Sequence, residues 1–164
     1  MKYVKLFETL VNETEVDLTK QKEMAKEIEE AIQKIFPKSV IKCNVGGRFA
    51  WSISIYFTLG TRYANGIDDN DPCRTSINIW LNQDGSMADK LKVECNRGGG
   101  VDIKSVNPHY AYDHVKAGWR NFTCKKEDVV KKLVEFFTKY KEVIKANIDK
   151  MTPFDKEIAT EALS

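Results

Sequence analysis

The chain has 164 residues, of which 42% are hydrophobic and 30% charged, a composition typical of a folded domain of ordinary size. Its 26 basic and 24 acidic side chains leave a net charge of +2, which excludes a strongly acidic DNA mimic and a strongly basic nonspecific nucleic-acid binder. No apolar run approaches the ~18 residues of a membrane span, and the start MKYVKLFETL lacks the features of a signal peptide. We therefore expect one cytoplasmic domain over residues 1–164, without membrane contact.

The first part of the chain predicts a helix after an apolar segment of ambiguous period. Residues 3–11 can form either a short strand or one helical turn. Asp17 or Thr19 can cap the following helix. Pro37 disfavours helical geometry at Phe36, so the helix ends there. The apolar stripe of this helix consists of Met24, Ile28, Ala31, Ile32 and Ile35.

A hairpin follows the helix. Residues 40–45 and 49–58 both alternate between apolar and polar side chains, which is the pattern of strands with one buried face. Gly46 and Gly47 lie between them and can take the positive φ angles of a two-residue turn. Trp51 falls on the predicted core face, whereas Tyr56 falls on the opposite face.

Further strands are predicted after a long loop over residues 59–73, which is rich in Gly, Asn, Asp and Pro. Alternation returns over residues 74–82, a turn follows at Asp84 and Gly85, and a fourth strand covers residues 91–95. Residues 101–106 can add a fifth. Residues 109–124 lack a clear period and are assigned to a loop that can include an edge strand from Trp119 to Cys124.

The C-terminal part predicts two helices. A broad apolar stripe over residues 129–148 indicates a long helix. Thr152 as N-cap, Pro153 at the first helical position and Asp155 in the first turn then mark a short final helix.

These elements predict an α+β domain: a four- or five-stranded antiparallel sheet with the N-terminal helix and the long C-terminal helix packed on one face. The other face is expected to be exposed and available to a partner. An exposed Tyr and Trp among small polar side chains are suited to such a contact. The residues predicted on that face are Ser52, Ser54, Tyr56, Ser76, Asn78 and Trp80.

No motif predicts a cofactor, a metal or a catalytic site. The four cysteines, Cys43, Cys73, Cys95 and Cys124, are too widely spaced for a typical zinc site with His109 and His114, and we expect reduced thiols, with Cys43 and Cys95 in the core. A Cys-His nucleophile pair is compatible with any such composition. Arg97 with three glycines lacks the rest of a phosphate-binding loop, and Asp68, Asp69 and Asp71 lack the spacing of a calcium loop.

Basic and aromatic side chains are the most informative candidates, because they can stack on bases and meet phosphates. They occur at Arg48, Trp51, Arg62, Tyr63, Arg97, Lys104, His109, Tyr110, Tyr112, His114, Lys116, Trp119 and Arg120. The partner-binding residues that we predict are Tyr56, Asn78, Trp80, Arg62, Tyr63, Tyr110, Tyr112, Trp119 and Arg120.

The segment AKEIEEAIQKIFPKSVIKCNVGGRFAWSISIYFTLG, residues 25–60, resembles one of the families called large polyvalent protein-associated domains. In that pattern a helix ends in Phe-Pro. After it come a short strand, a turn of small residues and a second strand of alternating Ser and aliphatic residues that ends near a Gly. The matching residues are Phe36, Pro37, Lys42, Val45, Ser52, Ile53, Ile55, Thr58 and Gly60. The family has a Trp where this chain has Phe57. The resemblance implies a protein of a phage or mobile element and supplies no catalytic residues.

Two functions from different classes follow. The first is a non-catalytic accessory protein of a phage or mobile element that binds and inhibits a host factor, such as one of anti-phage or CRISPR defence, through the free sheet face and the loops 61–73 and 109–120. The second is a nucleic-acid-binding module that uses Arg62, Tyr63, Lys116, Trp119 and Arg120. An enzyme of unknown class is a third alternative.

Overall fold

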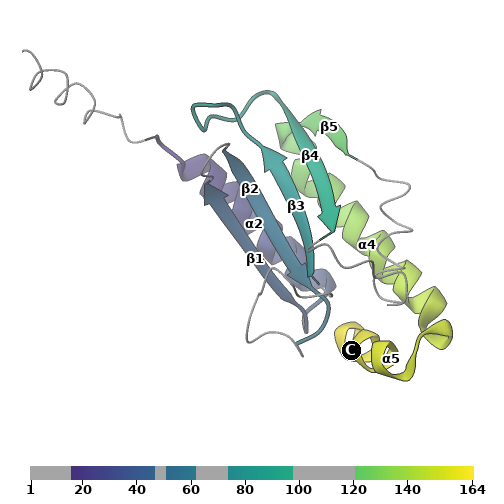
Figure 1. Cartoon of the computed structure of the whole chain (residues 1–164). Helices are drawn as coiled ribbons and strands as arrows, with labels where there is room; N and C mark the ends of the chain where they lie inside the picture. The colour runs from purple at the N-terminus through teal and green to yellow at the C-terminus, as the bar shows by residue number, and fades with distance from the viewer. Residues whose placement is uncertain (1–15, 47–50, 62–73, 98–120) are drawn as a thin grey trace, which may run out of the picture.

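The structure, a computed structural model, describes residues 16–46, 51–61, 74–97 and 121–164, with backbone only for residues 74, 75 and 95–97 (Figure 1). The helices are α2 (Thr19–Ile35), α4 (Val129–Asn147) and α5 (Pro153–Leu163). Short 3-10 turns at Lys126–Asp128 and Ile148–Lys150 flank α4. The strands are β1 (Val40–Gly46), β2 (Ser52–Thr58), β3 (Arg74–Trp80), β4 (Lys90–Arg97) and β5 (Phe122–Lys125).

The five strands form one antiparallel sheet in chain order, β1-β2-β3-β4-β5. Ile55 lies opposite Cys43 of β1 and Ile77 of β3, and β5 pairs with β4 through Leu91 and Cys124. The predicted α+β class and antiparallel sheet are confirmed. The edge strand predicted within residues 119–124 is observed as β5, and the strand predicted over residues 101–106 lies outside the described residues.

The β1–β2 connection differs from the prediction. Gly46 pairs with Ser52, so five residues separate the two strands and the expected two-residue turn at Gly46 and Gly47 is wrong. The glycine pair can form a tight turn, but the register is set by the apolar side chains that must share the core face. Trp51 precedes β2 instead of belonging to it. Its carbonyl accepts the amide of Leu81 at 3.0 Å.

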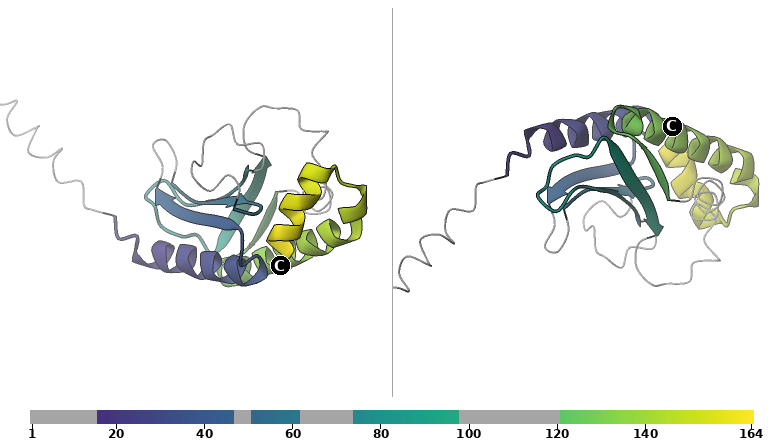
Figure 2. Two further views of the ribbon diagram at one scale, coloured as in Figure 1. Left: turned by 90° about the horizontal axis from the view of Figure 1, so that it is seen from below. Right: turned by 90° about the horizontal axis from the view of Figure 1, so that it is seen from above.

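Helices α2 and α4 lie together on one face of the sheet, as the views along the sheet show (Figure 2). The amide of Thr19 donates to Asp17 Oδ1 at 3.0 Å at the start of α2, and α2 ends before Phe36 as predicted. Lys141 of α4 donates to the carbonyl of Ile35 at 2.7 Å, which satisfies one of the free carbonyls at the end of α2. None of the helices in the described ranges is long and apolar enough to cross a membrane.

The core lies between the sheet and the two helices. Ile53, Ile55, Ile77 and Ile79 point into it and are fully buried. Four rings, one from the residue that follows α2 and the others from β2 and α4, pack beside them in tilted and edge-on pairs with centroids 5.0–6.5 Å apart, the geometry that aromatic pairs prefer. These rings belong to Phe36, Phe57, Phe137 and Tyr140.

Candidate functional site

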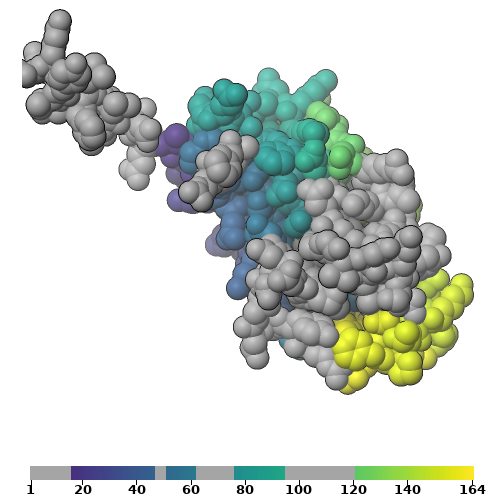
Figure 3. All heavy atoms as spheres, viewed as in Figure 1, coloured from purple at the N-terminus to yellow at the C-terminus, as the bar shows by residue number. Residues whose placement is uncertain are grey.

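The candidate site is the face of the sheet that points away from α2 and α4, which we call the distal face. The registers place the predicted set Ser52, Ser54, Tyr56, Ser76, Asn78 and Trp80 on it. They add Lys42, Asn44, Lys90, Lys92, Glu94, Thr123 and Lys125. A space-filling view from this side shows atoms of β1 to β4 at the surface beside β5 (Figure 3).

A polar row crosses the middle of the distal face. Asn44, Ser54, Asn78 and Glu94 lie opposite one another on four neighbouring strands. Ser54 Oγ donates to Asn78 Oδ1 at 2.9 Å, and the Ser52 hydroxyl lies 3.2 Å from that of Ser54. The Ser54 hydroxyl has one proton and donates it to Asn78, so its oxygen is left as an acceptor toward Ser52. The Asn78 amide nitrogen makes no hydrogen bond within the described part of the chain.

Trp80 is held in place beside this row. Its indole Nε1 donates to Glu94 Oε2 at 2.8 Å, and Lys92 makes an ion pair with the other carboxylate oxygen of Glu94. The pKa of the Glu94 carboxyl is lowered, first by the hydrogen bond from Lys92 and then by that from Trp80. The indole is therefore anchored at one end by a charge-assisted hydrogen bond.

Lysines on β1, β4 and β5 give the distal face a positive charge. Lys90 and Lys125 are directly opposite each other, and both are exposed, as is Lys92. Lys42 lies on the same face at the other edge of the sheet. Among the side chains that the structure describes here, Glu94 is the one acid against these four cations. The surface is thus matched to a partner that carries negative charge.

The predicted site residues fall into two groups. Tyr56, Asn78 and Trp80 lie on the distal face, where all three are half-buried and not exposed as predicted, since they stand on the inner strands β2 and β3, which have a neighbouring strand on each side. Arg62, Tyr63, Tyr110, Tyr112, Trp119 and Arg120 lie outside the described residues, as does Lys116, and their role stays a prediction.

Sequence reasoning missed Lys90, Lys92, Glu94 and Lys125 as parts of this surface. The alternation over residues 91–95 already indicated that Lys92 and Glu94 point away from the core. What was missing was the strand order, because the β3–β4 pairing brings Glu94 within reach of Trp80.

The two thiols that the structure describes, those of Cys43 and Cys124, show no sign of activation. Cys43 and Cys124 are half-buried and free, and burial raises the pKa of both, that of Cys43 to about 12. Cys43 was predicted in the core and lies only at its margin, because β1 is an edge strand. No cluster of three or more potential His, Cys, Asp or Glu metal ligands is found within the described ranges.

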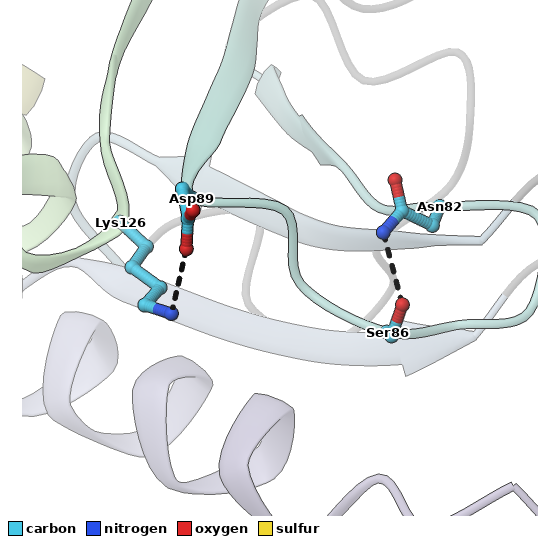
Figure 4. Close-up of polar contacts among 4 residues, drawn as sticks. All are labelled: Asn82, Ser86, Asp89 and Lys126. Carbon is cyan, nitrogen blue, oxygen red and sulfur yellow. Dashed lines mark hydrogen bonds and ion pairs between the residues drawn. The ribbon is translucent and has the colours of Figure 1, made fainter.

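A hollow of about 550 Å³ lies at the start of α2, between that helix and the β3–β4 connection. In this connection Asn82 donates to Ser86 at 2.9 Å, and Lys126 Nζ lies 3.3 Å from Asp89 Oδ1 (Figure 4). Gln21, which also lines the hollow, is buried and donates to the carbonyl of Gly85 at 2.7 Å. This bond holds the β3–β4 turn against α2 and thereby stabilises the fold.

The class that the fold defines is an α+β domain with a five-stranded antiparallel meander covered by helices on one face. The comparisons add no relative: no protein-family model matches the chain, and no curated protein or solved structure matches it. We therefore infer the function of the chain from the chemistry of the distal face.

Proposed function

We propose that this chain is a non-catalytic binding protein that recognises a protein partner through the distal face. The observation that carries the proposal is the Trp80 ring, fixed by Glu94 and set beside a row of small polar side chains. A ring held in one orientation loses little conformational entropy on binding, and Trp is the residue most enriched at energetic centres of protein interfaces.

The finer proposal is that the partner is a host factor, such as a component of anti-phage or CRISPR defence, which the protein inhibits on behalf of a phage or mobile element. Its support is the resemblance of residues 25–60 to the large polyvalent protein-associated domains. A negatively charged patch on the partner would complement Lys42, Lys90, Lys92 and Lys125.

The test is capture of partners from a nuclease-treated bacterial lysate with the wild type and with Ser54→Arg. Ser54 lies at the centre of the distal face, so a long cation there obstructs a flat protein interface. The control is Lys139→Glu, an exposed position on α4. We expect a protein that the wild type and the control retain and Ser54→Arg loses. Equal recovery by all three would refute the proposal, provided that Ser54→Arg unfolds at the wild-type temperature.

Nucleic acid is the second candidate, and the lysines favour it. Lys92 lies opposite the ring of Trp80, and Lys90 and Lys125 follow on the same face of β4 and β5, so cations and an aromatic ring share one surface, as in single-strand binders. Under this alternative Ser54→Arg retains binding because the added cation can meet a phosphate, whereas Lys90→Glu/Lys125→Glu loses it. Gel shifts with single- and double-stranded probes at increasing salt separate the two functions, since phosphate contacts weaken steeply with ionic strength.

A further inference from the structure

The second feature of interest is the outer edge of β1. Cys43 donates its amide to Glu29 Oε2 at 3.0 Å, so this amide points away from β2. In an antiparallel strand the N–H and C=O of one residue point to the same side, and every second residue repeats the direction. Ile41, Cys43 and Val45 therefore present their backbone groups outward. No strand pairs with this edge within the described part of the chain.

A groove of about 230 Å³ lies along this edge. Lys22, Ala25 and Lys26 of α2 form one side, and Cys43 and Val45 of β1 form the other. Figure 1 shows that α2 and β1 run in opposite directions. An extended chain in this groove would have β1 backbone on one side and helix side chains below it, which is the arrangement in which peptides add a strand to a sheet.

Glu29 occupies the place of a missing strand. Its carboxylate oxygen accepts from Cys43 as the carbonyl of a neighbouring strand would. Side chains of this kind also protect sheet edges against aggregation. Glu29 satisfies only one of the outward groups, however, and it is a side chain that can rotate away, unlike a proline or a bulge.

We propose that this groove binds an extended, acidic segment of a protein partner as an additional antiparallel strand beside β1. The partner's carbonyl replaces Glu29 on the Cys43 amide. A carboxylate opposite Val45 then meets Lys22 and Lys26, which lie N-terminal to Glu29 on α2 and therefore toward the Val45 end. Lys26 is available because its ion pair with Glu30 spans 3.8 Å between highly exposed side chains.

This inference concerns a site separate from the distal face and does not depend on it. The added strand would approach from the side of β1 that faces away from Trp80. Side chains opposite Ile41, Cys43 and Val45 point toward the helices, because directly paired residues share a face. A small apolar residue opposite Cys43 and an acidic residue opposite Val45 are therefore the expected features of the segment.

The probe is the capped peptide acetyl-Thr-Glu-Thr-Val-Thr-Val-Thr-amide, with Glu designed to lie opposite Val45 and the first Val opposite Cys43. Binding to the full chain is followed by amide chemical shifts up to millimolar peptide. We expect shifts at Ile41, Cys43 and Val45 and on the Lys22–Lys26 turn. N-methylation of the first Val keeps its side chain and removes the donor to Cys43, and this should weaken binding about threefold to tenfold.

Three variants test the details. Val45→Pro removes an outward amide and leaves the β1–β2 ladder intact, so it should abolish binding. Glu29→Ala removes the competing acceptor and should strengthen binding, a gain that a folding defect would not produce. The double variant Lys22→Glu/Lys26→Glu should bind the Glu-containing peptide about twofold to fivefold more weakly than the wild type does. It should bind a peptide with Lys in place of that Glu more tightly than the original peptide.

Absence of shifts at millimolar peptide, equal binding of the N-methylated peptide, or shifts confined to the distal face would each overturn the proposal. A dimer of the free protein that Val45→Pro disrupts would also overturn it, by showing that a second copy occupies the edge. The variants of this test leave Trp80 and its contacts unchanged, so this site and the distal face can fail independently.

Discussion

Trp80 and Glu94 lie on neighbouring strands, and the indole Nε1 of Trp80 donates to Glu94 Oε2 at 2.8 Å. Lys92 holds the same carboxylate from its other side. The ring is thus oriented by the protein before a partner binds, and this removes part of the entropic cost of association. The ion pair and the hydrogen bond should also change how Glu94 titrates, which can be measured.

Glu94 should titrate below the ordinary range of a glutamate. The folded protein lowers its pKa, so the charged form contributes stability above the unfolded-state pKa and that contribution is lost as the pH falls through the lower folded value. A carboxyl-carbon NMR titration should give a midpoint below that of a glutamate in an unfolded peptide. Lys92→Met should raise the midpoint, since Lys92 is the largest cause of the shift. A wild-type midpoint at or above the ordinary value would contradict this geometry.

Phe57→Ala should strongly destabilise the fold. Phe57 is 1% exposed and lies between Phe36 and Phe137, with ring centroids 5.2 and 5.0 Å away. Loss of a ring from a packed core costs about 3–5 kcal/mol. Urea unfolding should show this loss, while Lys42→Ala on the exposed side of β1 should stay within about 0.5 kcal/mol of the wild type. A cost similar to that of Lys42→Ala would show that the ring cluster is not the core.

Thr152→Ala should destabilise the C-terminal helix. Thr152 Oγ1 accepts the Asp155 amide at 3.2 Å and donates to Asp155 Oδ2 at 2.7 Å, and Asp155 is buried. Loss of an N-cap costs about 1 kcal/mol, and a value toward 2 is expected because a buried carboxylate also loses a donor. Thr152→Ser keeps both bonds and should unfold at nearly the wild-type urea concentration. An equal loss of unfolding free energy in Thr152→Ala and Thr152→Ser would contradict the role of the Thr152 hydroxyl as the N-cap.

Gly85→Ala should destabilise the β3–β4 turn. Gly85 has φ +80°, and an added Cβ would lie 2.9 Å from Val16 Cγ1 and 3.3 Å from the Trp51 ring. The left-handed backbone costs about 1–2 kcal/mol for a residue with a side chain, and the crowding adds to this. Thermal unfolding of Gly85→Ala and of Val16→Ala/Gly85→Ala separates the two terms. Full recovery in the double variant would refute the backbone contribution.

The fold was largely predictable because its signals are local. Alternation in residues 52–58 and 74–80 and the 3.6-residue period of residues 129–148 each describe one buried side of one element. The cap at Thr152 and the helix end at Phe36 depend on neighbouring residues in the same way. The β1–β2 turn was mispredicted because a local turn preference at Gly46 and Gly47 conflicts with a register that is set by packing across strands.

The candidate site was only partly predictable because it depends on pairing between distant segments. That Tyr56, Asn78 and Trp80 share a face follows from alternation. That Glu94 meets Trp80, or that Lys90 faces Lys125, follows only from the strand order. The groove at β1 has no local signal at all, since it needs α2 and the edge of β1 side by side.

The central claim is that Trp80 anchors a protein partner on the distal face. The most direct measurement is isothermal titration of the captured partner with Trp80→Ala and with Phe154→Ala, which removes a ring that is 46% exposed on α5. If the claim holds, Trp80→Ala weakens binding about thirtyfold or more, as expected for a central aromatic residue of an interface, and Phe154→Ala leaves the affinity unchanged. Equal affinities of Trp80→Ala and the wild type would contradict it.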